Sequence, residues 1–197
     1  MVAIRTFVAI RLNERVHARL ERLMSELRGA MPARAIRWVA AENIHLTLEF
    51  LGDVESTRME LVPRALRIAA AGASPCEIQV AGLGCFPNTR APRVIWAGVQ
   101  ESTGALAALQ GAVRRELRKL ELVRDEREFS AHLTLGRVRQ EAPPSAIREI
   151  GQVVEKTKTG NLEKQDVTSI HLFRSDLRPD GPIYAVLAEL PLGAPRE

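Results

Sequence analysis

The stretch His-Leu-Thr-Leu at residues 45–48 recurs unchanged at residues 132–135, in a chain of 197 residues that has only four histidines. Side chains alternate between the two faces of a β-strand, so in each copy the histidine and the threonine lie on one face and the two leucines on the other. The pattern predicts two half-buried strands that anchor their leucines in a core and present an imidazole beside a hydroxyl.

The second copy begins 87 residues after the first, and each copy lies in a similar series of strands and helices. Outside the tetrapeptides the two halves share little residue-level similarity. The spacing favours two α+β lobes with a cleft between them. No long linker or low-complexity stretch divides the chain, so we expect residues 1–197 to form a single bilobal domain.

Apolar periodicity and turn residues predict the remaining elements. We expect strands at residues 2–10, 37–39, 44–51, 76–83, 93–99, 131–138, 167–173 and 183–190. We expect helices from Asn13 to Gly29, at residues 56–71 and 102–120, and from Pro143 onward. The apolar face of the second helix is expected to consist of Leu61, Ala65, Leu66 and Ile68.

The composition, 46% hydrophobic and 26% charged, is that of an ordinary globular protein with a substantial core. The first ten residues are too short and too interrupted by Arg5 for a secretory signal, and no apolar run is long enough to span a membrane, so we expect a cytoplasmic protein. The two cysteines, Cys76 and Cys85, form no C-x-x-C motif and join no Cys/His ligand set. We therefore expect neither a metal nor a cofactor.

The repeated residues suit acid–base chemistry at phosphorus. A histidine with a pKa near 6.5 can accept or donate a proton close to neutral pH, and two of them can hold opposite protonation states in one reaction. Threonine hydroxyls can donate to phosphate oxygens, and the guanidinium of Arg137 can add charge-assisted bonds. The formal net charge of +4 also suits an anionic partner. A phosphodiester fits this set of groups.

Two residues have the wrong parity for the histidine face. Arg137 lies five residues beyond His132, so a bulge or strand end is needed to bring it to that face, and Gly136 makes such a break plausible. Phe50 lies five residues beyond His45, and we expect it to pack in the core, with support of a substrate base as the alternative. For His17 and His171 we expect no catalytic role.

With these motifs in view, the chain resembles the 2H phosphoesterase superfamily, and most closely the bacterial and archaeal RNA 2′,3′-cyclic phosphodiesterases, also called 2′-5′ RNA ligases. The family's H-x-[ST]-φ motif is present twice, at residues 45–48 and 132–135. One departure is Ala131, since the family often has proline before the second histidine. Further matches cover nearly the whole chain, at residues 5–9, 38–39, 42–44, 50–52, 86–87, 92–96, 175–177 and 181–184.

The resemblance implies an α+β fold of two pseudo-symmetric lobes, each an antiparallel-rich sheet with helices on its outer face, around a central cleft. It implies that His45 and His132 are the catalytic pair, with His45 as the acid that expels O3′ and His132 as the base that activates water. Thr47, Thr134 and Arg137 resemble the family's phosphate ligands. The expected partners are RNA ends with a 2′,3′-cyclic phosphate, including tRNA fragments or small cyclic nucleotides, and we expect a monomer.

The expected reaction is metal-independent hydrolysis of the cyclic phosphate to a 2′-phosphomonoester. Two alternatives stay open. The same site run in reverse would join a cyclic-phosphate end to a 5′-hydroxyl in a 2′-5′ linkage. A non-catalytic module would bind RNA ends without turnover, although binding alone does not require two titratable groups at the phosphate.

Overall fold

The computed structural model describes residues 3–123, 128–178 and 181–193. The elements of its first part are β1 (Ala3–Arg11), α1 (Glu14–Ala30), β2 (Ile36–Trp38), the 3-10 turn η1 (Ala41–Asn43), β3 (His45–Glu55), η2 (Ser56–Arg58) and α2 (Leu61–Ala71). They are followed by β4 (Cys76–Phe86), β5 (Val94–Gln100), α3 (Ala105–Arg118), β6 (His132–Val138), α4 (Pro144–Lys156), β7 (Asn161–Val167), β8 (Ser169–Arg178) and β9 (Gly181–Pro191).

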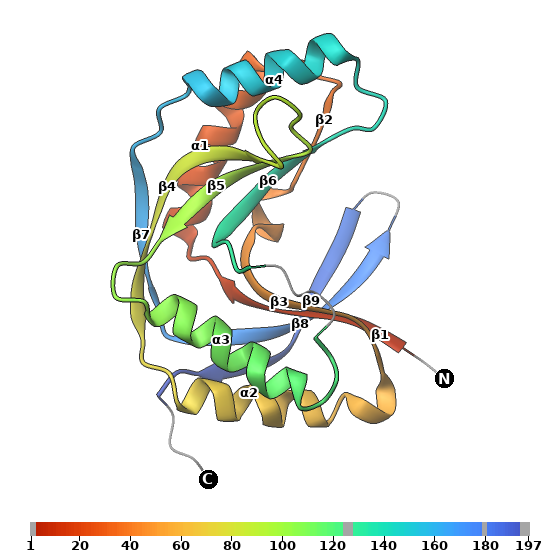
Figure 1. Ribbon diagram of the computed structural model, residues 1–197, viewed down its shortest axis with the longest axis vertical. Helices are drawn as coiled ribbons and strands as arrows, with labels where there is room; N and C mark the ends of the chain where they lie inside the picture. The colour runs from red at the N-terminus through yellow and green to blue at the C-terminus, as the bar shows by residue number, and fades with distance from the viewer. Residues whose placement is uncertain (1–2, 124–127, 179–180, 194–197) are drawn as a thin grey trace.

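A single curled sheet joins all the strands of the described residues. The strand order is β7-β4-β5-β6-β3-β1-β8-β9, with β2 added beside β6, and the neighbouring strands run antiparallel. The helices lie outside the curl, as Figure 1 shows. The expected α+β fold with antiparallel sheets is confirmed, and the structure adds that both halves belong to one sheet.

The two motif strands, β3 and β6, are neighbours at the centre of this sheet. Outward from them the order is symmetric, because β1, β8 and β9 follow on one side and β5, β4 and β7 on the other. The helices are exchanged between the halves: α1 follows β1 but contacts β7, and α3 follows β5 but contacts β3 and α2. Each half of the sheet is therefore covered by helices from both parts of the chain (Figure 1).

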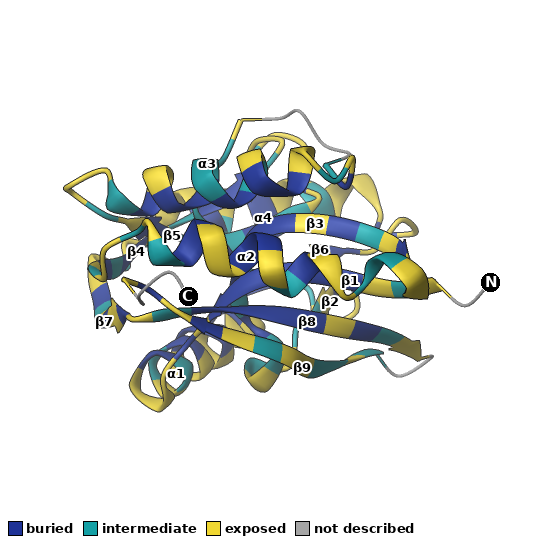
Figure 2. Cartoon of the chain, turned by 90° about the horizontal axis from the view of Figure 1, so that it is seen from below, coloured by how far each residue is buried: buried dark blue, intermediate teal, exposed yellow. Residues whose placement is uncertain are grey.

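The core lies between the helices and the outer face of the sheet. Leu46 and Leu133 are fully buried there, as their place opposite the histidines requires. Helix α1 begins as the sequence predicts, since the Asn13 side chain accepts a hydrogen bond from the Val16 backbone N–H at 2.9 Å. Figure 2 shows β8 and much of β1 and β3 buried beneath α2 and α3, whereas β9, at the sheet edge, is mostly partly buried or exposed.

The expected helix at residues 56–71 is divided into η2 and α2, and β3 continues past residue 51 to Glu55. Two further details differ from the sequence-based expectation. The apolar face of α2 includes Ala65 and Leu66 as expected, but Leu61 and Ile68 are 42% and 53% exposed. The buried stripe runs instead through Val62, Ala69 and Ala70, because these positions share one helix face with Ala65 and Leu66 and face β9 and α3. The second difference is β7, a strand that the sequence analysis missed and that pairs with β4.

Among the described residues, no helix combines the length and apolar character needed to cross a membrane.

Candidate active site

The two motif strands meet at one residue pair. Within the described residues, the register between β3 and β6 consists of Leu46 opposite Leu133. Antiparallel pairing then places His45 across from Thr134 and Thr47 across from His132, all on the inner face of the curl, since the leucines occupy the helix face. The two histidines are therefore placed diagonally to each other across this pair.

A bulge in β3 returns Phe50 to the histidine face. The register with β1 shifts between Val8 and Ala9, whose partners are Glu49 and Thr47, so Leu48 is extra. Leu48 and Glu49 are both buried. Helix α3 stabilises this segment, because Gln110 Nε2 donates to the Leu48 carbonyl at 3.3 Å and Arg114 Nε lies 3.1 Å from Glu49 Oε2.

Phe50 is 57% exposed, so the expectation that it packs in the core is wrong. The bulge is the reason, because it reverses the parity on which that expectation rests. The Phe50 ring lies 6.0 Å from the ring of Phe7, centroid to centroid. Phe7 in turn stacks on His45, so Phe50 extends an aromatic surface outward from the first histidine.

A matching bulge in β6 brings Arg137 to the histidine face. The register with β5 shifts between Ile95 and Trp96, whose partners are Gly136 and Thr134, which leaves Leu135 extra. The break therefore occurs beside Gly136, as the sequence predicts. The Leu135 carbonyl accepts a hydrogen bond from the Val39 N–H at 2.8 Å. A side chain at position 136 would meet β2, since a Cβ there would lie 2.9 Å from Ile36 Cγ2.

Each catalytic candidate has its ring fixed by the backbone two residues earlier. His45 Nδ1 lies 2.8 Å from the Asn43 carbonyl oxygen, and His132 Nδ1 lies 2.7 Å from the Ser130 carbonyl oxygen. A carbonyl can only accept, so the hydrogen must be on Nδ1 in both rings. Nε2 is then the nitrogen at which each ring can take or give a proton.

The surroundings of the two rings differ. His45 stacks on Phe7 at 4.6 Å and meets the edge of Tyr184 at 5.2 Å, beside a small inner-face cluster of Phe7, Ala9 and Phe173. This burial lowers the pKa of His45 to about 4, although its bond to the Asn43 carbonyl acts in the opposite direction. His45 is therefore neutral in the free protein near pH 7.

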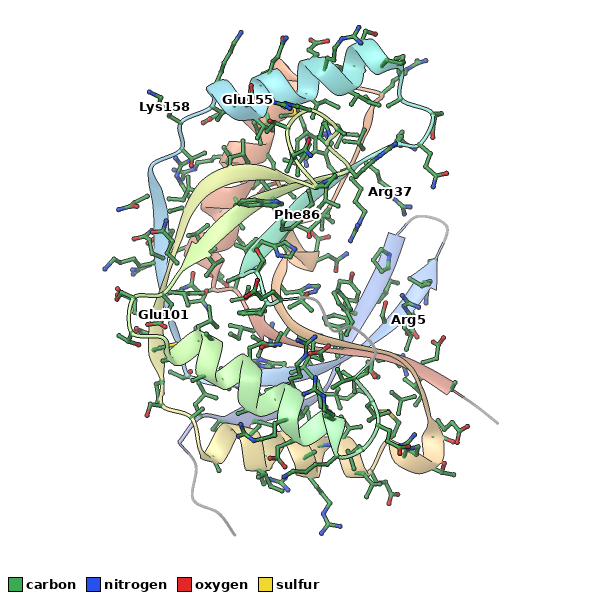
Figure 3. The ribbon with its side chains drawn as sticks, viewed as in Figure 1. Arg5, Arg37, Phe86, Glu101, Glu155 and Lys158 are labelled. Carbon is green, nitrogen blue, oxygen red and sulfur yellow. The ribbon has the colours of Figure 1, made fainter. Side chains whose placement is uncertain are left out.

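His132 has one aromatic neighbour among the described residues, the ring of Phe86 at 4.9 Å in an edge contact. Phe86 itself lies against Trp96 at 5.3 Å. Figure 3 shows Phe86 on the side of the sheet that faces the opposite half. The second imidazole is thus supported from one side and less enclosed than the first.

Arg137 acts on the His45 environment through Tyr184. Burial raises the pKa of the Tyr184 hydroxyl, and the positive charges of Arg137 and Arg5 oppose that rise. Arg137 comes from β6 and Arg5 from β1, so the charges of both halves of the sheet reach this tyrosine. The structure therefore gathers His45, Thr47, His132, Thr134 and Arg137 on one face, with Phe50 at its border.

The LigT-like phosphoesterase family model matches the chain twice, at residues 10–96 and 98–184, and each match contains one of the two histidine motifs. The chain belongs to the LigT-like phosphoesterase family. Among its curated relatives, the RNA 2′,3′-cyclic phosphodiesterase of Archaeoglobus fulgidus is 34% identical over 91% of this chain and 96% of its own length. The enzyme of the same name from Thermus thermophilus is 33% identical over 95% of this chain and 90% of its own length.

Solved structures agree on the fold. The crystal structure of TT0787 from Thermus thermophilus superposes with a TM-score of 0.81 and 28% identity, covering 98% of this chain and all of that one. Escherichia coli LigT, crystallised with phosphate, gives a TM-score of 0.73 at 22% identity, with the same coverage of both chains. The family membership expected from the two motifs is confirmed.

The sequence did not identify several residues that the structure places in the site. The aromatic rings around the histidines come from Phe7, Phe86, Phe173 and Tyr184, on four different strands. Two signals pointed to three of them: Phe7, Phe86 and Tyr184 lie in segments that resemble the family, and Tyr184 is the only tyrosine of the chain. The carbonyl groups of Asn43 and Ser130 carry no side-chain signal.

A cavity lies apart from this face. It has a volume of about 530 Å³ and lies between β4, β7 and the end of α4, where Figure 3 labels Glu155 and Lys158. None of the six predicted site residues lines it. The described residues also contain no group of three or more histidine, cysteine, aspartate or glutamate side chains arranged to hold a metal.

The low pKa of His45 predicts a pH-dependent stability. The ring titrates near 6.5 when unfolded and near 4 when folded, so the stabilisation is fully present above pH 6.5 and is lost as the pH falls to about 4. The loss is about 3 kcal/mol of unfolding free energy. Urea unfolding across this range should show a flatter pH dependence for His45→Asn, which cannot titrate but keeps an N–H near the Asn43 carbonyl.

His132→Asn is the matched control, because it makes the same change in the second motif. It should leave the loss of stability between pH 6.5 and 4 in place. Equal pH slopes for the wild type and His45→Asn would show that His45 is not the buried neutral group described above.

Proposed function

We propose that this protein hydrolyses RNA ends carrying a 2′,3′-cyclic phosphate to 2′-phosphomonoesters, with His45 and His132 as an acid–base pair. The observation that carries the proposal is the Leu46–Leu133 pairing, which sets two imidazoles on one face beside two threonines. Among the described residues, neither Nε2 has a hydrogen-bond partner. The names of the curated relatives, RNA 2′,3′-cyclic phosphodiesterases, support the same activity.

The reaction needs one base and one acid. His132 Nε2 takes a proton from water, the water oxygen bonds to phosphorus, the P–O3′ bond breaks, and a proton from His45 Nε2 goes to O3′. The product keeps its P–O2′ bond and is a 2′-phosphomonoester. Proton exchange with solvent then restores the starting states of the two rings.

His45 must gain a proton before it can act as the acid. Its ring is neutral in the free protein, because burial lowers its pKa to about 4. A cyclic phosphodiester carries one negative charge, and an anion beside the ring raises its pKa. Substrate binding and proton uptake by His45 are therefore coupled, which keeps the acid uncharged until a phosphate is present.

Three further side chains stabilise the negative charge that develops on the pentacoordinate phosphorus. Thr47 and Thr134 supply hydroxyl donors from the same face as the histidines, and Arg137 adds a charged fork of N–H groups. Phe50, exposed at the end of the aromatic surface, offers a ring on which the terminal base can stack. No metal or cofactor takes part in this proposal.

The same site can run in reverse, with a 5′-hydroxyl in place of water, and would then form a 2′-5′ linkage. Water is far more concentrated than RNA ends, so hydrolysis dominates. Both rings are held through Nδ1, which leaves Nε2 as the nitrogen for proton transfer. This arrangement favours an enzyme over a module that only binds RNA ends, because binding alone does not need two histidines that can exchange protons. A monomeric, cytoplasmic, single-domain protein completes the proposal.

The identity of the product tests this function. An RNA ending in a 2′,3′-cyclic phosphate should yield the 2′-phosphomonoester, and a 5′-hydroxyl acceptor should lead to little ligation. Phosphorus NMR distinguishes the products. A 3′-phosphomonoester as the main product would contradict the assignment of O3′ as the leaving oxygen, and no hydrolysis with substrate bound would favour the binding module.

The histidine pair predicts a specific mutational pattern. His45→Ala and His132→Ala should each lower kcat by roughly 10²- to 10⁴-fold, since each removes one proton-transfer group. The double variant should fall little further, because both rings act on one transition state. His17→Ala is the matched control, with near wild-type turnover expected. Near-full activity in either folded single variant would contradict the two-histidine mechanism.

A further inference from the structure

Two arginines lie directly opposite each other beside the histidine face. Strands β2 and β6 are antiparallel, and Arg37 is the cross-strand partner of Arg137. Both side chains are exposed, and neither forms an ion pair with any residue that the structure describes. Like charges directly opposite on a sheet are unfavourable. An anion between or across them would remove that repulsion.

Arg37 points to the inner face of the curl. The neighbouring Trp38 lies beneath the guanidinium of Arg28 from α1, 5.6 Å from the ring centroid, so Trp38 marks the helix side of β2. Strand alternation places Arg37 on the other side, with Arg137. Figure 3 shows Arg37 in the region between the two halves of the sheet.

The guanidinium of Arg37 extends across to the start of β9. Its Nη2 lies 3.9 Å from the position that a Cβ on Gly181 would occupy. The same part of β9 is held to η1, because Asn43 Nδ2 donates to the Pro182 carbonyl at 3.1 Å. His45 Nδ1 is hydrogen-bonded to the Asn43 carbonyl. Arg37 therefore faces the start of β9, which is hydrogen-bonded to the residue that supports His45.

The order of groups along this face defines a path for an RNA strand. His132, Thr134 and Arg137 follow one another along β6, and Arg37 lies beside Arg137 on the neighbouring strand β2. The histidines and threonines occupy the beginning of the path, where the proposed function puts the cyclic phosphate. Arg137 and Arg37 lie side by side at the far end of this row, so two positive charges are available past the reacting group.

We propose that Arg37 binds the phosphodiester of the nucleotide that precedes the cyclic end, while Arg137 binds the terminal phosphate. Two consecutive phosphates thereby neutralise the two opposed guanidinium groups, each suited to phosphate by its fork of donors. This inference rests on the proposed function and deepens it. The substrate class is an RNA strand of at least two nucleotides, and a mononucleotide cyclic phosphate leaves Arg37 without a ligand.

The test compares two substrates in wild type and Arg37→Gln. One is a trinucleotide that ends in a 2′,3′-cyclic phosphate, and the other is the corresponding mononucleoside 2′,3′-cyclic phosphate. Wild type should have the higher kcat/KM on the trinucleotide, and Arg37→Gln should reduce the ratio of the two kcat/KM values by about tenfold. Its trinucleotide kcat/KM should also depend less on salt, with a log–log slope smaller by about 0.7.

Arg148→Gln on the exposed surface of α4 is the matched control, since it removes the same charge from a helix that lies outside the curl of the sheet (Figure 1). It should keep the wild-type ratio and salt slope. An unchanged ratio in Arg37→Gln, or a wild-type ratio near one, would overturn the role of Arg37. Failure of wild type to hydrolyse either substrate would instead overturn the proposed function, so the two failures are distinguishable.

Discussion

The pairing of Leu46 with Leu133 is the contact on which the site depends. These two leucines are fully buried and join the two halves of the sheet at its centre. Because side chains alternate along a strand, burying the leucines forces the histidines and threonines of both motifs onto the opposite face. The same hydrophobic interaction that closes the core thus sets the positions of the groups that the proposed function uses, and a shift of one residue in either strand would separate them.

The two bulges extend this arrangement. Without them Phe50 and Arg137 would point into the helix layer, where a guanidinium would lose its hydration without a partner. Each extra residue has its carbonyl satisfied from outside the central ladder, Leu48 by Gln110 and Leu135 by Val39. The halves differ in what surrounds each imidazole: three aromatic rings enclose His45, and one contacts His132. A symmetric framework thereby gives two chemically distinct histidines.

Much of this could be read from the sequence, because the decisive pattern is local. Alternation within each His-Leu-Thr-Leu stretch fixes which residues share a face, and Gly136 indicated the break that Arg137 needs. The bulge in β3 had no such marker, since Leu48 and Glu49 look like ordinary strand residues. Phe50 was therefore expected in the core. Strand β7 was missed because its sequence, Asn-Leu-Glu-Lys-Gln-Asp-Val, is too polar to stand out. The aromatic neighbours of His45 come from β1, β8 and β9, and only the folded sheet order brings them together.

The central claim is that both imidazoles engage one phosphorus centre, and a crystal structure with a uridine–vanadate complex tests it most directly. Vanadate takes the five-coordinate geometry of the proposed transition state. The account predicts one vanadate on the inner face, with Nε2 of His45 and Nε2 of His132 hydrogen-bonded to its two apical oxygens, and with the hydroxyls of Thr47 and Thr134 on equatorial oxygens. A vanadate bound by one histidine alone, or bound away from the Leu46–Leu133 pair, would contradict the account.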